Sequence, residues 1–346
     1  MMFGTRPNRP ERSGVHDAQA VADRCHVAPL WALASTSARP RSCRGVARIQ
    51  IWASGWDSSA GAAIGYGGGA IPGLAVRIRE FNDVDGSDDP LAFATHTDRV
   101  RSLDAITEAK RWTYQMLLDQ DPAARFLDVG CGTGEDLTAL RGAIADAGVV
   151  VGADRARAML VEASDRMGAA TVRPPLVQAD AAVLPFADGA FDGARVDRVL
   201  LHVPSPGAVV QEMARLVRAG GRVVAIEPDF ETAIIGVPGE DSVQRRLKQL
   251  QTETLVRNPT VGRALVAMFR AASLDDIVLR GWVSIISDYH FAVDALGIEQ
   301  VAQRAAATVI DEGERDRWLG ALRQAASDGS FFSAMSFFGV CGTRAG

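Results

Sequence analysis

The chain has 346 residues, of which 47% are hydrophobic and 23% charged, and its formal net charge is −5. This composition is typical of a globular protein, and the acidic balance argues against a general nucleic-acid binder, which needs a basic surface. No run of about 18 to 20 apolar residues predicts a membrane span. The four cysteines and five histidines show no CxxC pair or metal-ligand spacing. We therefore expect no metal site and no disulfide scaffold, and a reducing cytoplasm fits.

Residues 1–80 differ in composition from the rest of the chain. The first part is rich in arginine and lacks an apolar repeat, and residues 61–73 are rich in Gly and Ala. Such a composition buries too little apolar surface to offset the entropy lost on ordering. We expect residues 1–80 to be a disordered or mis-called N-terminal extension, followed by one folded domain over residues 81–346.

The middle of the chain alternates between strand and helix patterns. An amphipathic helix is predicted at 100–118 and shorter helices at 135–147, 156–167 and 206–218. Apolar strands are predicted at 124–129, 148–154, 174–180, 191–197 and 220–229. Strands that alternate with helices at this interval predict right-handed crossovers and a parallel sheet.

The pattern changes after residue 229. Helices are predicted at 242–256, 261–272, 292–307 and 312–326, and strands at 276–286 and 331–344. Residues 230–272 and 290–329 are longer than simple connections between strands need to be. Together with the helix at 100–118, we expect them to cap the carboxyl edge of the sheet and cover a small, partly hydrophobic acceptor.

A glycine loop with the sequence LDVGCGTG follows the first strand of this alternation. Gly130 and Gly132 allow positive φ and a close approach of a ligand to the backbone. A Gly-x-Gly turn alone is weak evidence, because strand-to-helix turns use it without a ligand. Asp128, Asp154 and Asp180 strengthen the case, because each lies at the end of a strand, on the edge where open α/β sheets bind ligands.

The chemistry of these carboxylates suits a nucleoside. Asp154 can accept hydrogen bonds from both ribose hydroxyls, and Asp180 can accept one from an exocyclic adenine amine. A nicotinamide dehydrogenase is the nearest alternative, but its fingerprint requires a glycine where this chain has Glu135.

Taken together, these motifs resemble the class I S-adenosylmethionine-dependent methyltransferases of the small-molecule type, with a methyltransferase-11-like domain. The segments that carry the resemblance lie at 127–134, 152–156, 178–192 and 216–229. The resemblance implies an α/β fold with a Rossmann-like, doubly wound, seven-stranded, mostly parallel sheet, an antiparallel last strand and a helical cap. Residues 99–229 would form the cofactor-binding core, and residues 230–346 the cap and the C-terminal strands.

The resemblance also implies which residues bind S-adenosyl-L-methionine. The candidates are Asp128, Gly130, Cys131, Gly132, Asp154, Arg155, Asp180, Ala181, Asp197 and Arg198. The glycine loop would line the methionine part with backbone atoms, and Asp128 would hold its ammonium. Asp154 would bind the ribose and Asp180 the adenine edge, whereas the side-chain roles of Asp197 and Arg198 stay open.

His202 is the candidate catalytic residue. It follows the fourth strand near the expected position of the methyl group, and an imidazole titrates close to working pH, so it can act as a general base. The alternative is a histidine that only shapes the pocket. Cys131 is expected to be a packing residue, although its place at a helix start could lower its thiol pKa.

The sequence thus predicts a metal-independent, in-line transfer of a methyl group to a small molecule, in secondary metabolism. Two alternatives stay open: a ring C-methyltransferase of the ubiquinone or menaquinone type, and a protein that binds the cofactor without turnover. The sequence does not fix the oligomeric state, and a homodimer is one alternative.

Overall fold

The computed structural model describes residues 51–52, 81, 83–119, 124–168, 170, 172–237 and 239–346. The expectation for residues 1–80 falls outside these residues, apart from the short strand β1 (Ile51–Trp52), which pairs with β4 in the antiparallel direction. Within the described ranges, no helix is long and apolar enough to cross a membrane.

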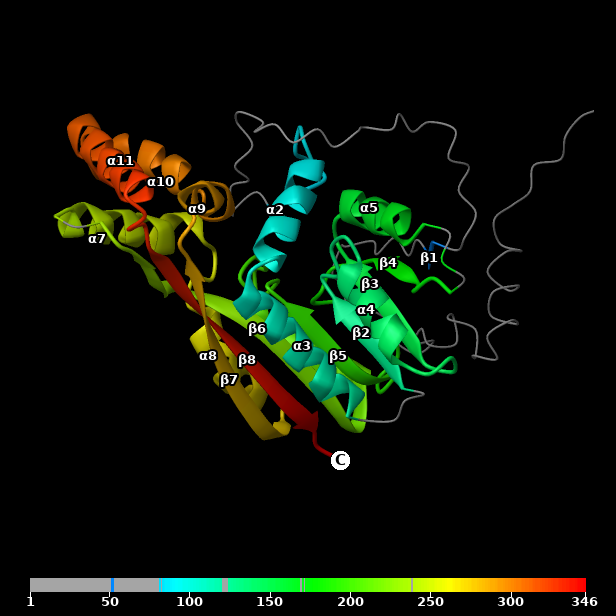
Figure 1. Cartoon of the computed structure of the whole chain (residues 1–346). Coiled ribbons are helices and arrows are strands. Elements are labelled where there is room, and N and C mark those ends of the chain that lie inside the picture. Colours follow the sequence, from blue (N-terminus) through cyan, green and yellow to red (C-terminus); the bar gives the residue numbers. More distant parts are fainter. Residues whose placement is uncertain are drawn as a thin grey trace, which may run out of the picture.

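One sheet dominates the described part of the chain, with eight strands in the order β1-β4-β3-β2-β5-β6-β8-β7 (Figure 1). Strands β2 to β6 run parallel to one another, and β8 runs antiparallel to both β6 and β7. Their bounds are β2 (Arg125–Val129), β3 (Val149–Asp154), β4 (Leu176–Gln178), β5 (Phe191–Asp197), β6 (Val217–Ile235), β7 (Leu274–Ile286) and β8 (Ser333–Arg344). The predicted Rossmann-like sheet with an antiparallel last strand is confirmed, with β1 as an additional edge strand.

Helices cover both faces of this sheet (Figure 1). On one face lie α3 (Asp104–Leu118), α4 (Glu135–Ala143) and α5 (Arg157–Met167); on the other lie α6 (Pro206–Leu216) and α8 (Val261–Ala271). The central strands are apolar along almost their whole length because both of their faces are buried.

Two helices predicted for the cap instead belong to the layers on the sheet. Helix α3 presents Trp112 to Trp282 of β7, with ring centroids 5.5 Å apart, and so packs on a sheet face. Helix α8 buries Leu265 and Phe269 against the opposite face. The assignment of residues 100–118 and 261–272 to the cap was therefore wrong: an amphipathic pattern shows that a helix has a buried side but not which surface it covers.

A separate helix, α2 (Leu91–Arg101), precedes α3 and was not predicted. Ser102 and Leu103 interrupt the predicted helix 100–118, so that α3 begins at Asp104. Figure 1 shows α2 between α5 and α9. In this position α2 can cover the carboxyl ends of the strands.

The cap itself is a helical unit with its own apolar core. It comprises α7 (Asp241–Leu250), the π-helix η3 (Gln251–Leu255), α9 (Tyr289–Leu296), α10 (Ile298–Ala306) and α11 (Glu312–Ser327). The predicted helix 292–307 is divided at Gly297, whose φ of 62° suits glycine. Strand β6 runs on to Ile235, past its predicted end, and so joins the sheet to the cap.

Candidate cofactor and acceptor site

The glycine loop between β2 and α4 requires glycine at two positions for different reasons. Gly130 has φ 70°, and a Cβ there would lie only 2.2 Å from a methyl of Val199. Gly132 has φ 53°, and a Cβ there would meet nothing within 4 Å among the described residues. The space beside Gly132 is therefore open, as a loop that receives a ligand requires.

Asp154, at the end of β3, binds this loop. Its carboxylate accepts hydrogen bonds from the backbone amides of Gly132, at 2.9 Å, and Ala156, at 2.8 Å. Burial raises the pKa of Asp154, and these two amides oppose the rise. A carboxylate has about four lone-pair positions, so Asp154 keeps acceptor capacity for a pair of ribose hydroxyls.

The predicted adenine residues lie on the same edge of the sheet. Asp154 pairs with Gln178 in the parallel register of β3 and β4, and Asp180 follows two residues later. The carboxylate of Asp180 is exposed and accepts a hydrogen bond of 2.9 Å from the amide of Ala182. Arg155 is exposed and Ala181 half-buried. The structure thus brings the predicted ribose and adenine residues together.

A buried ion network, made of Lys110, Asp128, Asp136, Arg195 and Asp197, lies beside the loop. The Arg195 side chain has no exposed area and donates to Asp128 at 2.9 Å and to Asp197 at 3.0 Å. Lys110 of α3 donates to Asp197 at 2.6 Å and also to Asp136. This network links strands β2 and β5 to helices α3 and α4.

Within the network the pKa values of the two strand-end aspartates shift in opposite directions. Burial raises the pKa of Asp128 to about 7, and Arg195 opposes this rise. Burial would also raise the pKa of Asp197, but Arg198, Lys110 and Arg195 together hold it well below its usual range. One oxygen of Asp128, Oδ2, is buried without a hydrogen-bond partner among the described residues. Asp128 therefore retains an acceptor for a cationic group, as its predicted role requires.

The segment after β5 carries Arg198 and His202. Arg198 has φ 57°, which is strained for a residue with a side chain, and its guanidinium donates to Asp197 at 2.9 Å. The fully buried carboxylate of Glu227 accepts the amides of Val199 and Leu200, at 2.8 and 2.6 Å. Burial raises the pKa of Glu227 to about 8 although these amides lower it. Glu227 thus fixes the path of this segment.

The segment that precedes α2 covers the side chain of His202. The Phe81 ring stacks on the imidazole, with centroids 4.8 Å apart and an interplanar angle of 24°. From α2, His96 faces the same segment; burial and the charge of Arg198 lower its pKa to about 4. Further along the chain, Asp85 accepts the first amides of α5, from Arg157 and Ala158, each at 2.8 Å. Residues 81–101 therefore cover the edge that carries His202.

Cys131 is buried in the loop, which confirms its packing role. Burial, reinforced by the charge of Asp154, raises its thiol pKa well above the usual value. The expectation that the helix start could lower this pKa was wrong, because desolvation and nearby carboxylates disfavour the thiolate.

Sequence reasoning missed Lys110, Arg195 and Glu227. Two signals were available: Lys110 is one of only two lysines in the chain, and Arg195 places a positive charge between Ala194 and Val196 in the middle of a predicted strand. Neither signal shows which carboxylate each cation meets, because their partners lie on other elements.

Fold and site together define a Rossmann-like domain that binds a nucleoside cofactor at the carboxyl edge of its sheet. A family model described as a methyltransferase domain matches residues 127–225. The chain is 34% identical, over 70% of its own length and 70% of the relative's, to an uncharacterized 37.1 kDa protein in transposon TN4556 of Streptomyces fradiae. It is also 33% identical to a demethylmenaquinone methyltransferase of Bacillus cereus, over 40% of this chain and 59% of that protein.

Among solved structures, the YcgJ protein of Bacillus subtilis has the same fold, with a TM-score of 0.50 and 20% identity over 69% of this chain and 99% of that one. Residues 127–225 therefore form a methyltransferase domain with the fold of the class I enzymes, and the cofactor of this domain is S-adenosylmethionine.

Proposed function

We propose that the protein methylates a small, partly apolar molecule held between the cofactor edge of the sheet and the helical cap. One connection carries the proposal. The side-chain amide of Asn258 donates to the carbonyls of Leu200 and Val203, each at 2.8 Å, on either side of His202. In the same loop, the carbonyl of Pro259 accepts the amide of Phe230, which lines the cavity of the cap. The segment with His202 and the cap cavity are thus neighbours.

The residues present fit the cofactor. The open space at Gly132 admits it, the unpaired oxygen of Asp128 suits its ammonium, and Asp154 has acceptors left for its ribose. When bound, S-adenosylmethionine supplies a methyl group on a sulfonium, which is reactive without help from the protein. The contribution of this chain is to bind and orient both reactants and to exclude water.

His202 is our candidate for the residue that takes a proton from the acceptor. An oxygen acceptor needs a base in reach, whereas an activated carbon or an amine needs less help. The stacking of Phe81 holds the imidazole plane in a defined orientation. In the alternative role, the same imidazole only shapes the pocket.

A ring carbon of a quinone precursor is the second candidate acceptor. The similarity to demethylmenaquinone methyltransferases favours it. However, the chain spans only 59% of the length of those relatives, so their substrate does not transfer directly.

Three further expectations form part of the proposal. The partner is a small molecule and not a nucleic acid, because the net charge is −5. The free, buried thiols of Cys131 and Cys341 support a reducing compartment such as the cytoplasm. A role in secondary metabolism and a homodimeric state are compatible with the fold.

The test is transfer from labelled S-adenosylmethionine to a panel of phenols, amines and quinones. We expect label in at least one small acceptor, with S-adenosylhomocysteine as the other product. A protein that binds S-adenosylhomocysteine but transfers label only to protein or nucleic acid contradicts the proposal. The type of acceptor that reacts distinguishes the first candidate from the second.

A further inference from the structure

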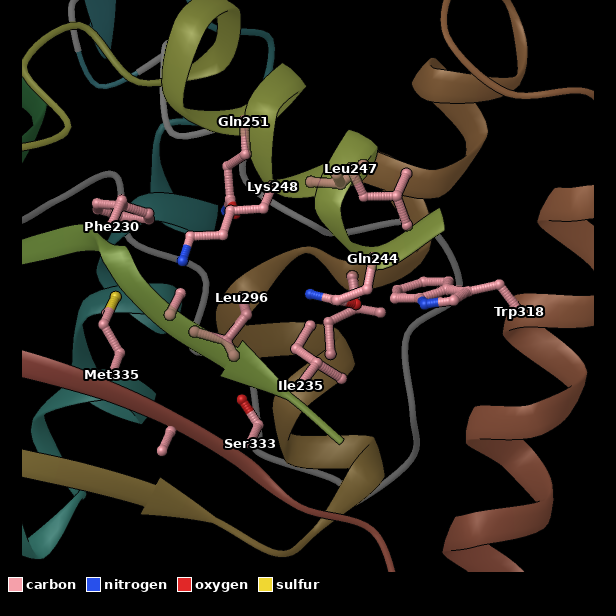
Figure 2. A pocket seen from close by; sticks show the side chains of 14 residues that line it. Phe230, Ile235, Gln244, Leu247, Lys248, Gln251, Leu296, Trp318, Ser333 and Met335 are labelled. Atoms are coloured by element: carbon pink, nitrogen blue, oxygen red, sulfur yellow. The ribbon is translucent and has the colours of Figure 1, made fainter. Parts of the chain in front are cut away.

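The cap encloses a cavity of about 40 Å³ between α7, η3, α10, α11 and the ends of β6 and β8 (Figure 2). A cavity needs about 10 to 15 Å³ to hold one water. This cavity therefore has room for a group of a few heavy atoms but not for a whole acceptor. Its wall is largely apolar and includes Phe230, Leu247 and Ile298.

Buried polar atoms without partners face this apolar space. Trp318 is only 1% exposed, and its indole Nε1 has no hydrogen-bond partner among the described residues. Gln244 Oε1 is likewise buried and unpaired within those residues. Figure 2 shows the Gln244 amide of α7 and the Trp318 ring of α11 at the cavity, on the side away from the Lys248 ammonium. Native structures rarely leave such atoms unpaired, so two at one cavity indicate a bound polar group.

Lys248 supplies the only cation that lines the cavity in the described part of the chain. Its ammonium has no ion-pair or hydrogen-bond partner there, whereas Lys110 is held by two carboxylates. In Figure 2 the Lys248 side chain extends from α7 toward Phe230. Among the described residues, no carboxylate lines this cavity, so the charge is available for an anion.

The backbone beside Lys248 is also unusual. Helix α7 passes into the π-helix η3, and Gln251, its first residue, lines the same cavity. π-helical turns are rare and are frequent at functional sites. The first residue of this irregular turn therefore lies at the cavity, whereas Glu253 and Thr254 are exposed.

We propose that this cavity binds a carboxylate of the methyl acceptor, with Lys248 as counter-ion at the end near Phe230. The inference rests on the proposed function and names the class of its substrate as an organic acid. A single cation matches the single negative charge of a carboxylate, whereas a phosphate monoester carries between about 1.5 and 2 negative charges at neutral pH. The body of the acceptor would extend past Phe230 toward the segment with His202.

Calorimetry on the full chain, saturated with S-adenosylhomocysteine, tests this inference by measuring the binding affinities of two probes. The probes are 4-hydroxybenzoate and 4-hydroxybenzyl alcohol, which have similar shapes but differ in charge. We expect the acid to bind about tenfold or more tightly than the alcohol, because its hydrogen bonds are charge-assisted. Lys248→Gln should bring this ratio close to one, and Lys248→Arg should keep part of it.

The matched control is Arg245→Gln, which removes a positive charge from the exposed side of the same helix. It should leave the ratio unchanged. Equal binding of the two probes, binding of neither, or an unchanged ratio in Lys248→Gln overturns the inference, and the cavity then holds water only. If the inference about the carboxylate fails but the protein binds S-adenosylhomocysteine and transfers label to a small acceptor, the proposed function still holds. Failure of label transfer to all small acceptors contradicts the proposed function itself.

Discussion

Arg195 of β5 lies directly opposite Asp128 of β2 in the parallel register, and its guanidinium donates a hydrogen bond of 2.9 Å to the Asp128 carboxylate. The arginine is fully buried and the aspartate nearly so. A buried carboxylate without a cation would take up a proton, because desolvation disfavours its charge. Arg195 therefore helps to keep Asp128 anionic at the place where a cationic group of the cofactor is expected.

Replacing this arginine tests the network. We expect Arg195→Met to lower the free energy of unfolding by about 3 to 5 kcal/mol, because it leaves buried carboxylates unpaired. Urea denaturation measures the loss. The double variant Arg195→Met/Asp128→Asn should recover part of it, and strictly additive losses would contradict the pairing. As a control, Arg218→Met removes a half-exposed ion pair with Asp192 and should cost less than about 1 kcal/mol.

Asp154→Ala should weaken binding of S-adenosylmethionine. The lost hydrogen bonds involve a charged acceptor and are worth on the order of 1.5 to 3 kcal/mol. Calorimetry measures the affinity, and far-UV circular dichroism should show a preserved fold. Asp146→Ala, at a fully exposed side chain, serves as the control. An affinity equal to that of the wild type would show that Asp154 does not bind the ribose.

His202→Ala distinguishes the two roles of this histidine. As a general base, its loss should lower kcat by roughly a hundredfold or more while cofactor affinity stays near the wild-type value. The wild-type rate should also fall at acidic pH, where the imidazole is protonated. A variant with near-normal kcat across the pH range would exclude the base role. Transfer would then depend on alignment alone.

The docking of α2 should depend on pH through His96. Burial and the charges of Arg198 and Arg99 lower its pKa to about 4 in the folded state, from the ordinary histidine value of 6.5. The unfolded chain therefore binds this proton more readily than the folded chain. The stabilising contribution of neutral His96 is present above about pH 6.5 and is lost as the pH falls toward 4. We expect the free energy of unfolding, measured with urea between pH 6.5 and 4, to fall with decreasing pH. This fall should be less steep in His96→Gln than in the wild type. His290→Gln, at an exposed site, is the control, and equal slopes in all three proteins would contradict the prediction.

The strands and the loop that carry the predicted cofactor residues were largely predictable from the sequence. The strand and the glycine loop are local features, because backbone conformation and burial on both faces restrict each position independently of distant residues. Asp154 and Asp180 were placed correctly on one edge because parallel strands bring their carboxyl ends together. The resemblance to the methyltransferases depends on the same short segments.

The tertiary structure alone decided which partners the charges meet and which surfaces the helices cover. Lys110 and Asp197 are far apart in sequence, and only the packing of α3 on the sheet brings them within 2.6 Å. In the same way, the amphipathic pattern of 100–118 predicts a buried side but does not distinguish the sheet from the cap. Likewise, Lys248 lines a cavity only because α7, α10 and α11 pack together. Periodicity and turn residues act within a few positions along the chain, whereas ion pairs and cavities depend on contacts between distant segments.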